Sequence, residues 1–190
     1  SGFAGAGLAI WGENMVPRDW YAGDVDRFGG TFLFLVGTAL VAAITLLFLR
    51  IPNLTKAQLE GEQRPMLEIM KQPVFIAAAV SATVAQCVMN FLMTATPIAM
   101  ISICGHSFGA TAGVIAWHTF AMFAPGVFTG FLVRKFGAVT IILIGLLLEA
   151  ACIGVALSGV KVIDFWLSMF LLGIGWNFTF TAATNLLSLI

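Results

Sequence analysis

The sequence predicts an all-α fold, a polytopic bundle of transmembrane helices, and three observations support this prediction. Hydrophobic residues make up 60% of the 190 positions and charged residues only 9%, whereas a soluble domain carries roughly 25% charged residues. Long uncharged stretches run along the chain, and most charges fall in the segments between them. So few charges could not solvate the surface of a soluble domain of this length, so lipid must cover much of it.

Five stretches are long and apolar enough to cross a bilayer, which takes about 20 residues each. Between Gln72 and Val133 there is no Asp, Glu, Lys or Arg, which leaves room for two crossings. The expected crossings are 28–49, 73–104, 110–133, 138–157 and 165–190. Residues 1–11 are apolar but only half as long as a crossing, so they resemble the end of an earlier helix. We therefore expect the natural polypeptide to continue beyond both ends.

The basic residues orient the chain, because Lys and Arg collect on the cytoplasmic side of membrane proteins. Six of them fall on one side of the predicted bundle: Arg50, Lys56, Arg64, Lys71, Arg134 and Lys135. The opposite side receives Arg18, Arg27 and Lys161. This bias favours a cytoplasmic position for the long polar segment 50–72. Within it, Met66 to Lys71 is either a short helix at the membrane interface or part of a solvated linker.

Proline and glycine residues predict where the helices bend or pack closely. Pro73 suits the first turn of a helix, and Pro97 predicts a bend in a helix that would otherwise exceed the hydrocarbon core. Pro125 and Gly126 predict a second bend. Small residues recur along this helix at Gly105, Gly109, Gly113, Gly126 and Gly130. They predict either close packing of two helices or a moving hinge.

Metal and cofactor chemistry find little support in the sequence. The three cysteines, Cys87, Cys104 and Cys152, lack the paired spacing of metal sites, and only two histidines accompany them. Their odd number implies no disulfide framework. We expect no metal and no cofactor. A Gly-rich phosphate-binding loop with Lys and Ser or Thr is also missing, which argues against ATP-driven transport by this chain.

The segment FAPGVFTGFLVRKFG, which starts at Phe123, resembles a loop motif of the major facilitator superfamily. The motif reads Gly, any, Leu, any, Asp, basic, any, Gly at the cytoplasmic ends of paired helices. Gly130, Leu132, Lys135 and Gly137 match it, while Arg134 occupies the Asp position. In family members that Asp helps to hold one access state, so this copy of the motif cannot act in the same way.

The resemblance implies twelve helices in two halves, of which this chain would supply about five and a half. Residues 1–49 would be the end of the first half, about the end of helix 5 and helix 6. Residues 50–72 would be the cytoplasmic loop between the halves, and 73–190 would cover about helices 7 to 10 of the second half. The stretch LLGIGWNFTFTAATNLL is similar to a Gly-Trp-Asn stretch of uncharacterised bacterial family members.

Two ionisable residues fall inside predicted crossings, and such residues are functional candidates because a bilayer penalises them. His118 lies near the middle of the 110–133 helix, and Glu149 lies near the middle of the 138–157 helix. Proton coupling through His118 or Glu149 is one interpretation. The alternative for Glu149 is a neutral acid that forms a hydrogen bond to an adjacent helix, since the ninth helix of family members is peripheral.

Uncharged polar residues recur along three predicted helices, mostly four residues apart, which places them on one helix face. The faces are Gln86, Asn90 and Thr94, then Thr111, His118, Met122 and Thr129, then Asn177, Thr181 and Asn185. The resemblance implies that these helices line a central cavity. The candidate substrate contacts are Gln86, Asn90, Thr94, Trp117, His118, Met122, Asn177 and Thr181. For the polar residues, the alternative is hydrogen bonding between helices. Trp117 and Trp176 could stack on an aromatic solute, and the alternative for these two residues is packing or lipid contact.

Together these observations predict a secondary active transporter of a small organic solute that works by alternating access and binds the solute near the bilayer midplane. Its expected partners are that solute, the lipid bilayer and, in one hypothesis, protons, and no nucleic acid. The expected location is a bacterial cytoplasmic (inner) membrane. A non-transporting helical subunit or a receptor is the alternative. An intramembrane enzyme is less favoured, because no paired carboxylates, His-Glu-any-any-His or Ser/His motif is present, so we expect no enzyme.

Overall fold

The computed structural model describes residues 29–48 and 65–188, and every regular element in them is helical. This confirms the predicted all-α class. The described residues fall into two units. The first contains α2 (Gly29–Leu47). The predicted crossing 28–49 corresponds to it, and its apolar part Leu35–Leu47 is shorter than a full span.

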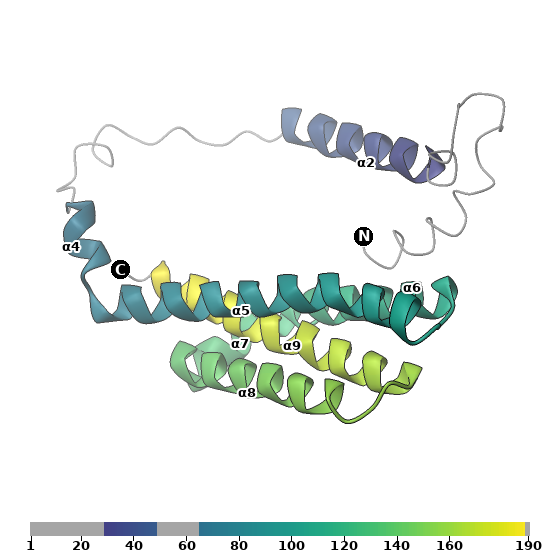
Figure 1. Cartoon of the computed structure of the whole chain (residues 1–190). Coiled ribbons are helices and arrows are strands. Elements are labelled where there is room, and N and C mark those ends of the chain that lie inside the picture. Colours follow the sequence, from purple (N-terminus) through teal and green to yellow (C-terminus); the bar gives the residue numbers. More distant parts are fainter. Residues whose placement is uncertain (1–28, 49–64, 189–190) are drawn as a thin grey trace. The chain divides into compact units, whose positions relative to one another are not determined.

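The second unit contains the remaining described helices (Figure 1). In chain order they are α4 (Met66–Met70), α5 (Pro73–Ile98), the π-helical turn η4 (Ala99–Ile103), α6 (Phe108–Phe123), α7 (Gly126–Phe136), α8 (Ala138–Ala156) and α9 (Val162–Leu187). Of the alternatives for the segment before α5, the short helix is found. Most of the predicted 50–72 loop lies outside the described residues.

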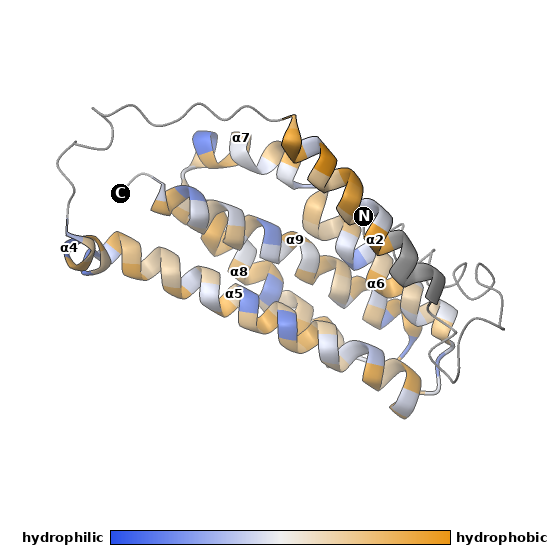
Figure 2. Cartoon of the chain, turned by 90° about the horizontal axis from the view of Figure 1, so that it is seen from above, coloured by the Kyte–Doolittle hydropathy of each residue, from blue (hydrophilic) through white to orange (hydrophobic). Residues whose placement is uncertain are grey.

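Three described helices are long and apolar enough to cross a membrane: Pro73–Ile103, Ala138–Ala156 and Val162–Leu187. Helices α6 and α7 pass the same test only when taken together as one candidate span, and they are bent by 42° at the break between them. The bend predicted at Pro125 and Gly126 is therefore confirmed. Figure 2 shows these helices mainly in orange and pale colours, with isolated hydrophilic positions.

Local chemistry explains where these helices begin. Pro73 is in the first turn of α5, where its missing N–H would have no partner in the helix. The Ser107 hydroxyl accepts a hydrogen bond from the Ala110 N–H at 3.2 Å and caps α6. Gly137 alone separates α7 from α8, and its φ of +84° is one that glycine adopts readily. The short connections before α6 and between α7 and α8 make the helices that they join run antiparallel.

The predicted start of α9 differs from the structure for a physical reason, whereas the predicted crossing 73–104 corresponds to α5 and η4. α9 begins at Val162, before the uncharged stretch, because the Asp164 carboxylate accepts a hydrogen bond from the Lys161 N–H at 2.9 Å. The charged residue Asp164 therefore lies inside the first turn of α9 and not in the loop before it. α5 continues through Pro97 into η4, where the Cys104 N–H bonds to the Ala99 carbonyl at 2.9 Å. The bend expected at Pro97 stays a prediction.

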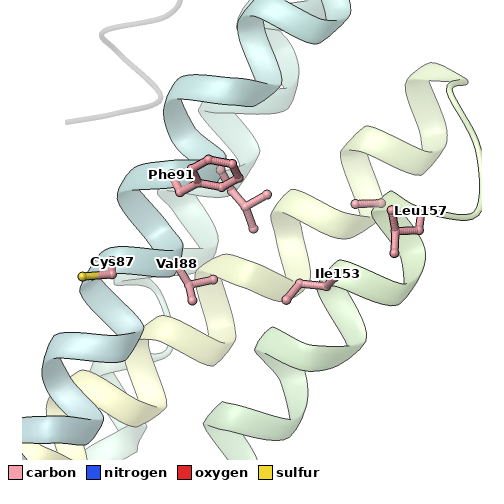
Figure 3. A pocket seen from close by; sticks show the side chains of 7 residues that line it. Cys87, Val88, Phe91, Ile153 and Leu157 are labelled. Atoms are coloured by element: carbon pink, nitrogen blue, oxygen red, sulfur yellow. The ribbon is translucent and has the colours of Figure 1, made fainter.

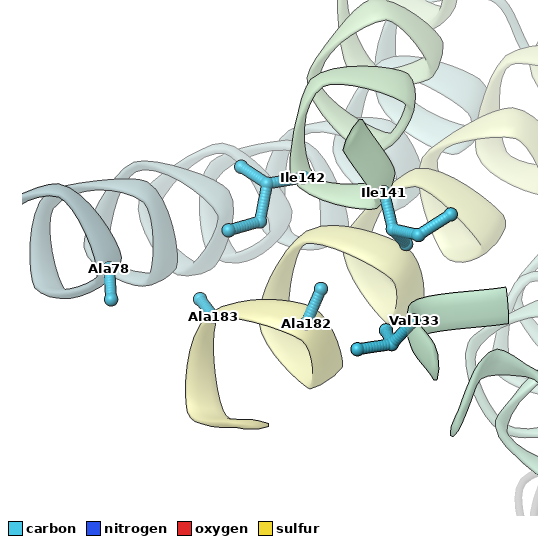
Figure 4. Packing of buried hydrophobic residues seen from close by; sticks show 6 residues of the cluster. All are labelled: Ala78, Val133, Ile141, Ile142, Ala182 and Ala183. Carbon is cyan, nitrogen blue, oxygen red and sulfur yellow. The ribbon is translucent and has the colours of Figure 1, made fainter. Parts of the chain in front are cut away.

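α9 is the helix on which the described bundle is built, since it packs against α5, α6, α7 and α8. Two clusters of buried apolar side chains surround it. One joins α5, α7, α8 and α9 with small and branched side chains (Figure 4): Ala78, Val133, Ile141, Ile142, Ala182 and Ala183. The other is formed by Met100, Val114, Cys152, Met169 and Leu172. Because lipid supplies no hydrophobic driving force between helices, this close packing is the main source of their association.

The glycines that mediate close packing are not the predicted ones. A Cβ atom built on Gly105, Gly109, Gly113 or Gly130 would meet nothing within 4 Å among the described residues, so none of these four mediates a close contact between described helices. At Gly126 it would make an ordinary contact, 3.5 Å from Nδ2 of Asn177. Small residues at helical spacing also occur on helix faces that no other described helix covers. Their spacing alone therefore does not show which glycines contact another helix.

Candidate functional site

The stretch Gly173-Ile174-Gly175-Trp176-Asn177 connects α9 to each helix around it. A Cβ on Gly173 would lie 2.7 Å from the His118 carbonyl oxygen, so this glycine lets α6 approach the α9 backbone. A Cβ on Gly175 would lie 2.9 Å from the Gly145 carbonyl oxygen of α8. The next two residues use their side chains: Trp176 bonds to α5 and Asn177 to the α6–α7 break. This short stretch therefore fixes the arrangement of the site.

A polar group links α5 to α9. The Trp176 Nε1–H donates to Oε1 of Gln86 at 3.1 Å, and Gln86 Nε2 lies 3.4 Å from Oδ1 of Asn90. Gln86 and Trp176 are half-buried, whereas Asn90 is exposed in this unit. Polar side chains in membrane helices usually face the bundle interior or a water-filled cavity rather than lipid. The indole of Trp176 therefore holds Gln86 in place, and the exposed Asn90 stays a predicted solute contact.

Aromatic rings accompany these groups along α9. Trp176 stacks on Phe180, with centroids 5.0 Å apart and planes 10° apart. Nearer the start of the helix, Trp166 stacks on Phe170 at 5.2 Å and meets Trp117 of α6 edge-on at 5.8 Å. Stacked and edge-to-face pairs hold rings in fixed orientations. The site thus combines oriented aromatic faces with a few amide groups.

His118 is buried in the bundle, with no exposed surface. Its Nδ1 lies 2.6 Å from the Met169 carbonyl oxygen of α9, and its Nε2 has no hydrogen-bond partner among the described residues. Thr96 of α5 donates to Sδ of the same Met169 at 3.4 Å. The imidazole therefore connects α6 to α9, and one of its nitrogens remains free to exchange a proton if water reaches it.

Glu149 lies on α8 at the close contact with α9, and only 3% of it is exposed. Its Cγ would be 3.0 Å from a Cβ on Gly175, and its carboxyl lies beside Thr179. Oε1 of Glu149 and Oγ1 of Thr179 have no hydrogen-bond partner in the described part of the chain. Cys152 is the nearby titratable neighbour. The position of this carboxyl between helices fits both the neutral-acid and the proton-carrying interpretations.

Asn177 connects α9 to both sides of the α6–α7 break. Its Nδ2 donates to the Met122 carbonyl oxygen at 2.7 Å, and its Oδ1 lies 2.7 Å from the Thr129 hydroxyl. Asn177, Met122 and Thr129 are all buried. In this structure Asn177 and Thr129 form hydrogen bonds between helices, which is the alternative that the sequence left open. Met122 takes part through its carbonyl group.

The remaining predicted residues are more dispersed. Thr94 is exposed and donates to the Asn90 carbonyl of its own helix at 2.9 Å. Thr181 is half-buried, Asn185 is exposed, and Thr111 is buried with its hydroxyl on the Ser107 carbonyl at 3.2 Å. The structure therefore forms two groups, one at Gln86 and one at Met122. They are joined through the adjacent residues Trp176 and Asn177.

The residues of the loop motif lie at the turn between α7 and α8. Arg134 and Lys135 are exposed in the last turn of α7, where positive charge is favourable near the carbonyl end of a helix. Lys135 Nζ lies 5.2 Å from the centroid of the Phe136 ring. A depression of about 400 Å³ at this turn is lined by Arg134 and Gly137 together with residues of α8 and the end of α9. Arg134 thus faces the end of α9.

A second depression, of about 460 Å³, lies between α5 and α8 (Figure 3). Its lining is almost wholly apolar: Cys87, Val88, Phe91, Leu92, Ile153, Ala156 and Leu157. None of the predicted substrate contacts is among them, so the groove does not coincide with the polar group at Gln86. Across the described residues, no cluster of His, Cys, Asp and Glu could hold a metal ion.

Sequence reasoning missed five residues that shape the site. Gly145, Gly173 and Gly175 escaped because they occur in apolar helices without a repeated spacing, although the GIG triplet was a visible signal. Trp166 is not next to any of the predicted polar positions, so nothing in the sequence singled it out. Thr179, fully buried beside Glu149, lies between the residues of the predicted polar face and gave no sequence signal.

Comparison with known proteins identifies the relatives of this chain. A family model described as Major Facilitator Superfamily matches residues 2–190. The riboflavin transporter RfnT of Brucella anthropi is 38% identical over 186 residues, which cover 97% of this chain and 45% of that protein. The uncharacterized MFS-type transporter YddS of Bacillus subtilis is 30% identical, over 94% of this chain and 45% of its own. The chain thus spans about half the length of these curated relatives. No solved structure matches it.

Proposed function

Because the chain belongs to the Major Facilitator Superfamily, we propose that it forms part of a secondary transporter that moves a small organic solute by alternating access. Its apolar helices make it an integral membrane protein. The proposed location is the bacterial cytoplasmic membrane, with the 50–72 loop on the cytoplasmic side. The relatives named as transporters support transport over catalysis.

The proposed solute is a planar heteroaromatic molecule of the flavin class. The support is twofold: a riboflavin transporter is 38% identical over nearly the whole chain, and the site carries oriented indole and phenyl rings beside amide groups. Stacking on Trp176 or Trp117 would hold a flat ring. Carboxamides such as Asn90 would pair with the carbonyl and N–H groups of a heterocycle. No described charge lies in this polar group, which fits an uncharged ring.

The observation that carries the proposal is the hydrogen bond between Trp176 and Gln86 across α5 and α9. A buried or half-buried tryptophan needs a partner for its N–H, and here the partner is a second residue on the predicted cavity face. The bond fixes the indole plane and leaves the Gln86 amide nitrogen 3.4 Å from Asn90. The three side chains therefore form a pre-organised polar edge beside an aromatic face, which is what binding sites for aromatic solutes require.

Proton coupling is the finer part of the proposal. His118 and Glu149 are the buried acid and base of the described spans, and buried ionisable groups in membranes recur in proton relays. Each would hold a proton in one access state and release it in the other. His118→Ala and Glu149→Gln should each flatten the dependence of uptake on external pH. Uptake that keeps its pH dependence in both variants would remove the coupling role.

Counterflow in proteoliposomes containing the intact protein tests the proposal. Vesicles preloaded with unlabelled riboflavin should accumulate labelled riboflavin transiently and saturably, and empty liposomes should not. Riboflavin should be recovered chemically unchanged. Saturable counterflow of another solute, with none of riboflavin, would keep the transporter and reject the flavin class. Binding without flux would indicate a non-transporting subunit or receptor, and chemical conversion an enzyme.

A further inference from the structure

The break between α6 and α7 leaves a main-chain group without its helical partner. Pro125 has no N–H, so it cannot bond to the preceding turn. The Ala124 N–H still reaches the Phe120 carbonyl at 2.9 Å, and regular bonding resumes with the Thr129 N–H on the Pro125 carbonyl at 2.9 Å. Across the break, no described backbone N–H bonds to the Met122 carbonyl. This oxygen is buried, where an unpaired carbonyl is costly.

Asn177 of α9 supplies the missing donor. Its Nδ2 lies 2.7 Å from the Met122 carbonyl oxygen, which is a short distance for a neutral hydrogen bond. The bond takes the place that the Gly126 N–H would occupy in a continuous helix. A Cβ on Gly126 would lie 3.5 Å from the same Nδ2, an ordinary van der Waals contact, so Gly126 lies directly against the Asn177 amide. A side chain from a third helix thus completes the hydrogen bonding at the end of α6.

The other end of the same amide holds α7. The Thr129 hydroxyl lies 2.7 Å from Oδ1 of Asn177 and 2.8 Å from the Pro125 carbonyl oxygen, and it has one proton to donate. The Pro125 carbonyl already accepts from the N–H groups of Phe128 and Thr129. Oδ1 of Asn177 has no other described donor. Donation to Asn177 therefore satisfies more groups, and the carboxamide bridges the two sides of the 42° bend.

We infer that Asn177 is a positioning residue: its carboxamide replaces the hydrogen bond that the Gly126 N–H would donate to the Met122 carbonyl in a continuous helix, and it sets the angle between α6 and α7 against α9. Two hydrogen bonds on opposite sides of a break resist changes in that angle, whereas either bond alone would allow rotation. The bend then moves with α9 as one unit. Its effect on transport rests on the proposed function, but the bridge itself does not.

A double-mutant cycle with Pro125 tests the inference in the intact, purified protein. Asn177→Ala should lower the Tm by about 3 to 7 °C, since it leaves the Met122 carbonyl unpaired and frees the Thr129 hydroxyl. In the Pro125→Ala background, a restored helix provides the Gly126 N–H, and the same change should lower the Tm by less than about 2 °C. Asn185→Ala, an exposed asparagine of the same helix, is the matched control and should change little.

Thr129→Val provides a second cycle that leaves the proline in place. If one carboxamide holds both sides, Thr129→Val should add little to Asn177→Ala, because its bond is already lost. Equal effects of Asn177→Ala with and without Pro125, or full additivity with Thr129→Val, would overturn the inference. These Tm measurements need no transported solute, so they stand whether or not the proposed function does.

Transport kinetics separate positioning from solute binding. Asn177→Ala should lower the maximal rate about tenfold and change KM less than about threefold, because the residue acts on the bend and not on the solute. A raised KM with an unchanged maximal rate would make Asn177 a solute contact and would contradict the inference.

Discussion

Replacing Gly145 with alanine tests the contact between α8 and α9. A Cβ at this position would lie 2.7 Å from the Gly175 carbonyl oxygen and 2.7 Å from the Thr179 N–H nitrogen, and closer still to the Thr179 hydroxyl. Ordinary van der Waals contact begins at 3.4 Å. Two of these neighbours are backbone atoms that cannot rotate away, so the helices must separate by several tenths of an ångström.

The size of the effect follows from this clash. Overpacking of a close contact costs about 1 to 3 kcal/mol, and backbone neighbours place Gly145→Ala in the upper part of that range. At about 2 to 4 °C per kcal/mol for a protein of this size, the Tm should fall by about 4 to 12 °C. Tryptophan fluorescence during heating of the purified protein measures this change in Tm, because Trp166 and Trp176 lie on α9.

Gly154 provides the matched control on the same helix. A Cβ there would meet nothing within 4 Å of the described chain, and alanine is favoured over glycine in a helix by about 0.5 to 1 kcal/mol. Gly154→Ala should therefore leave the Tm unchanged or raise it slightly. If Gly145→Ala unfolds at the wild-type temperature while Gly154→Ala behaves as expected, the close contact between α8 and α9 is not present in the protein.

Three further changes test individual contacts by the same Tm measurement. Gly173→Ala places a Cβ 2.7 Å from the His118 carbonyl oxygen and should cost about as much as Gly145→Ala; a neutral result would exclude the close α6–α9 contact. Ser107→Ala removes the cap of α6 and should cost about 1 kcal/mol, whereas Ser107→Asp should restore most of it. Asp164→Ala removes the bond to the Lys161 N–H and should cost a similar amount; an unchanged Tm would show that this cap contributes nothing.

Hydropathy predicted the fold because membrane insertion depends on local sequence. The uncharged run that ends at Val133, followed by Arg134 and Lys135, placed the end of α7 within three residues. Pro125 revealed the break, since a missing N–H is a property of one residue. The start of α9 was placed too late because Asp164 caps the helix instead of lying outside it. Sequence rules thus predict a helix end or a break correctly where a single residue determines it.

The candidate site was predictable only in part, because its geometry depends on which helices meet. Face spacing grouped Gln86 with Asn90, and the structure keeps them together. Spacing could not show that Asn177 points at the α6–α7 break or that Trp176 reaches Gln86, since these contacts join residues far apart in the chain. The same limit explains Gly109 and Gly145: both lie in apolar helices, and among the described residues only Gly145 meets a close neighbour.

The solute affinity of Gln86→Ala tests most directly the claim that side chains between α5 and α9 hold the transported solute. Losing the partner of the Trp176 N–H and the amide beside Asn90 should raise KM about tenfold, which corresponds to 1.4 kcal/mol, with the maximal rate within about twofold. Thr83→Ala, an exposed residue of the same helix that bonds to its own helix at the Ala79 carbonyl, should leave both constants unchanged. A wild-type KM in correctly folded Gln86→Ala would place the solute elsewhere.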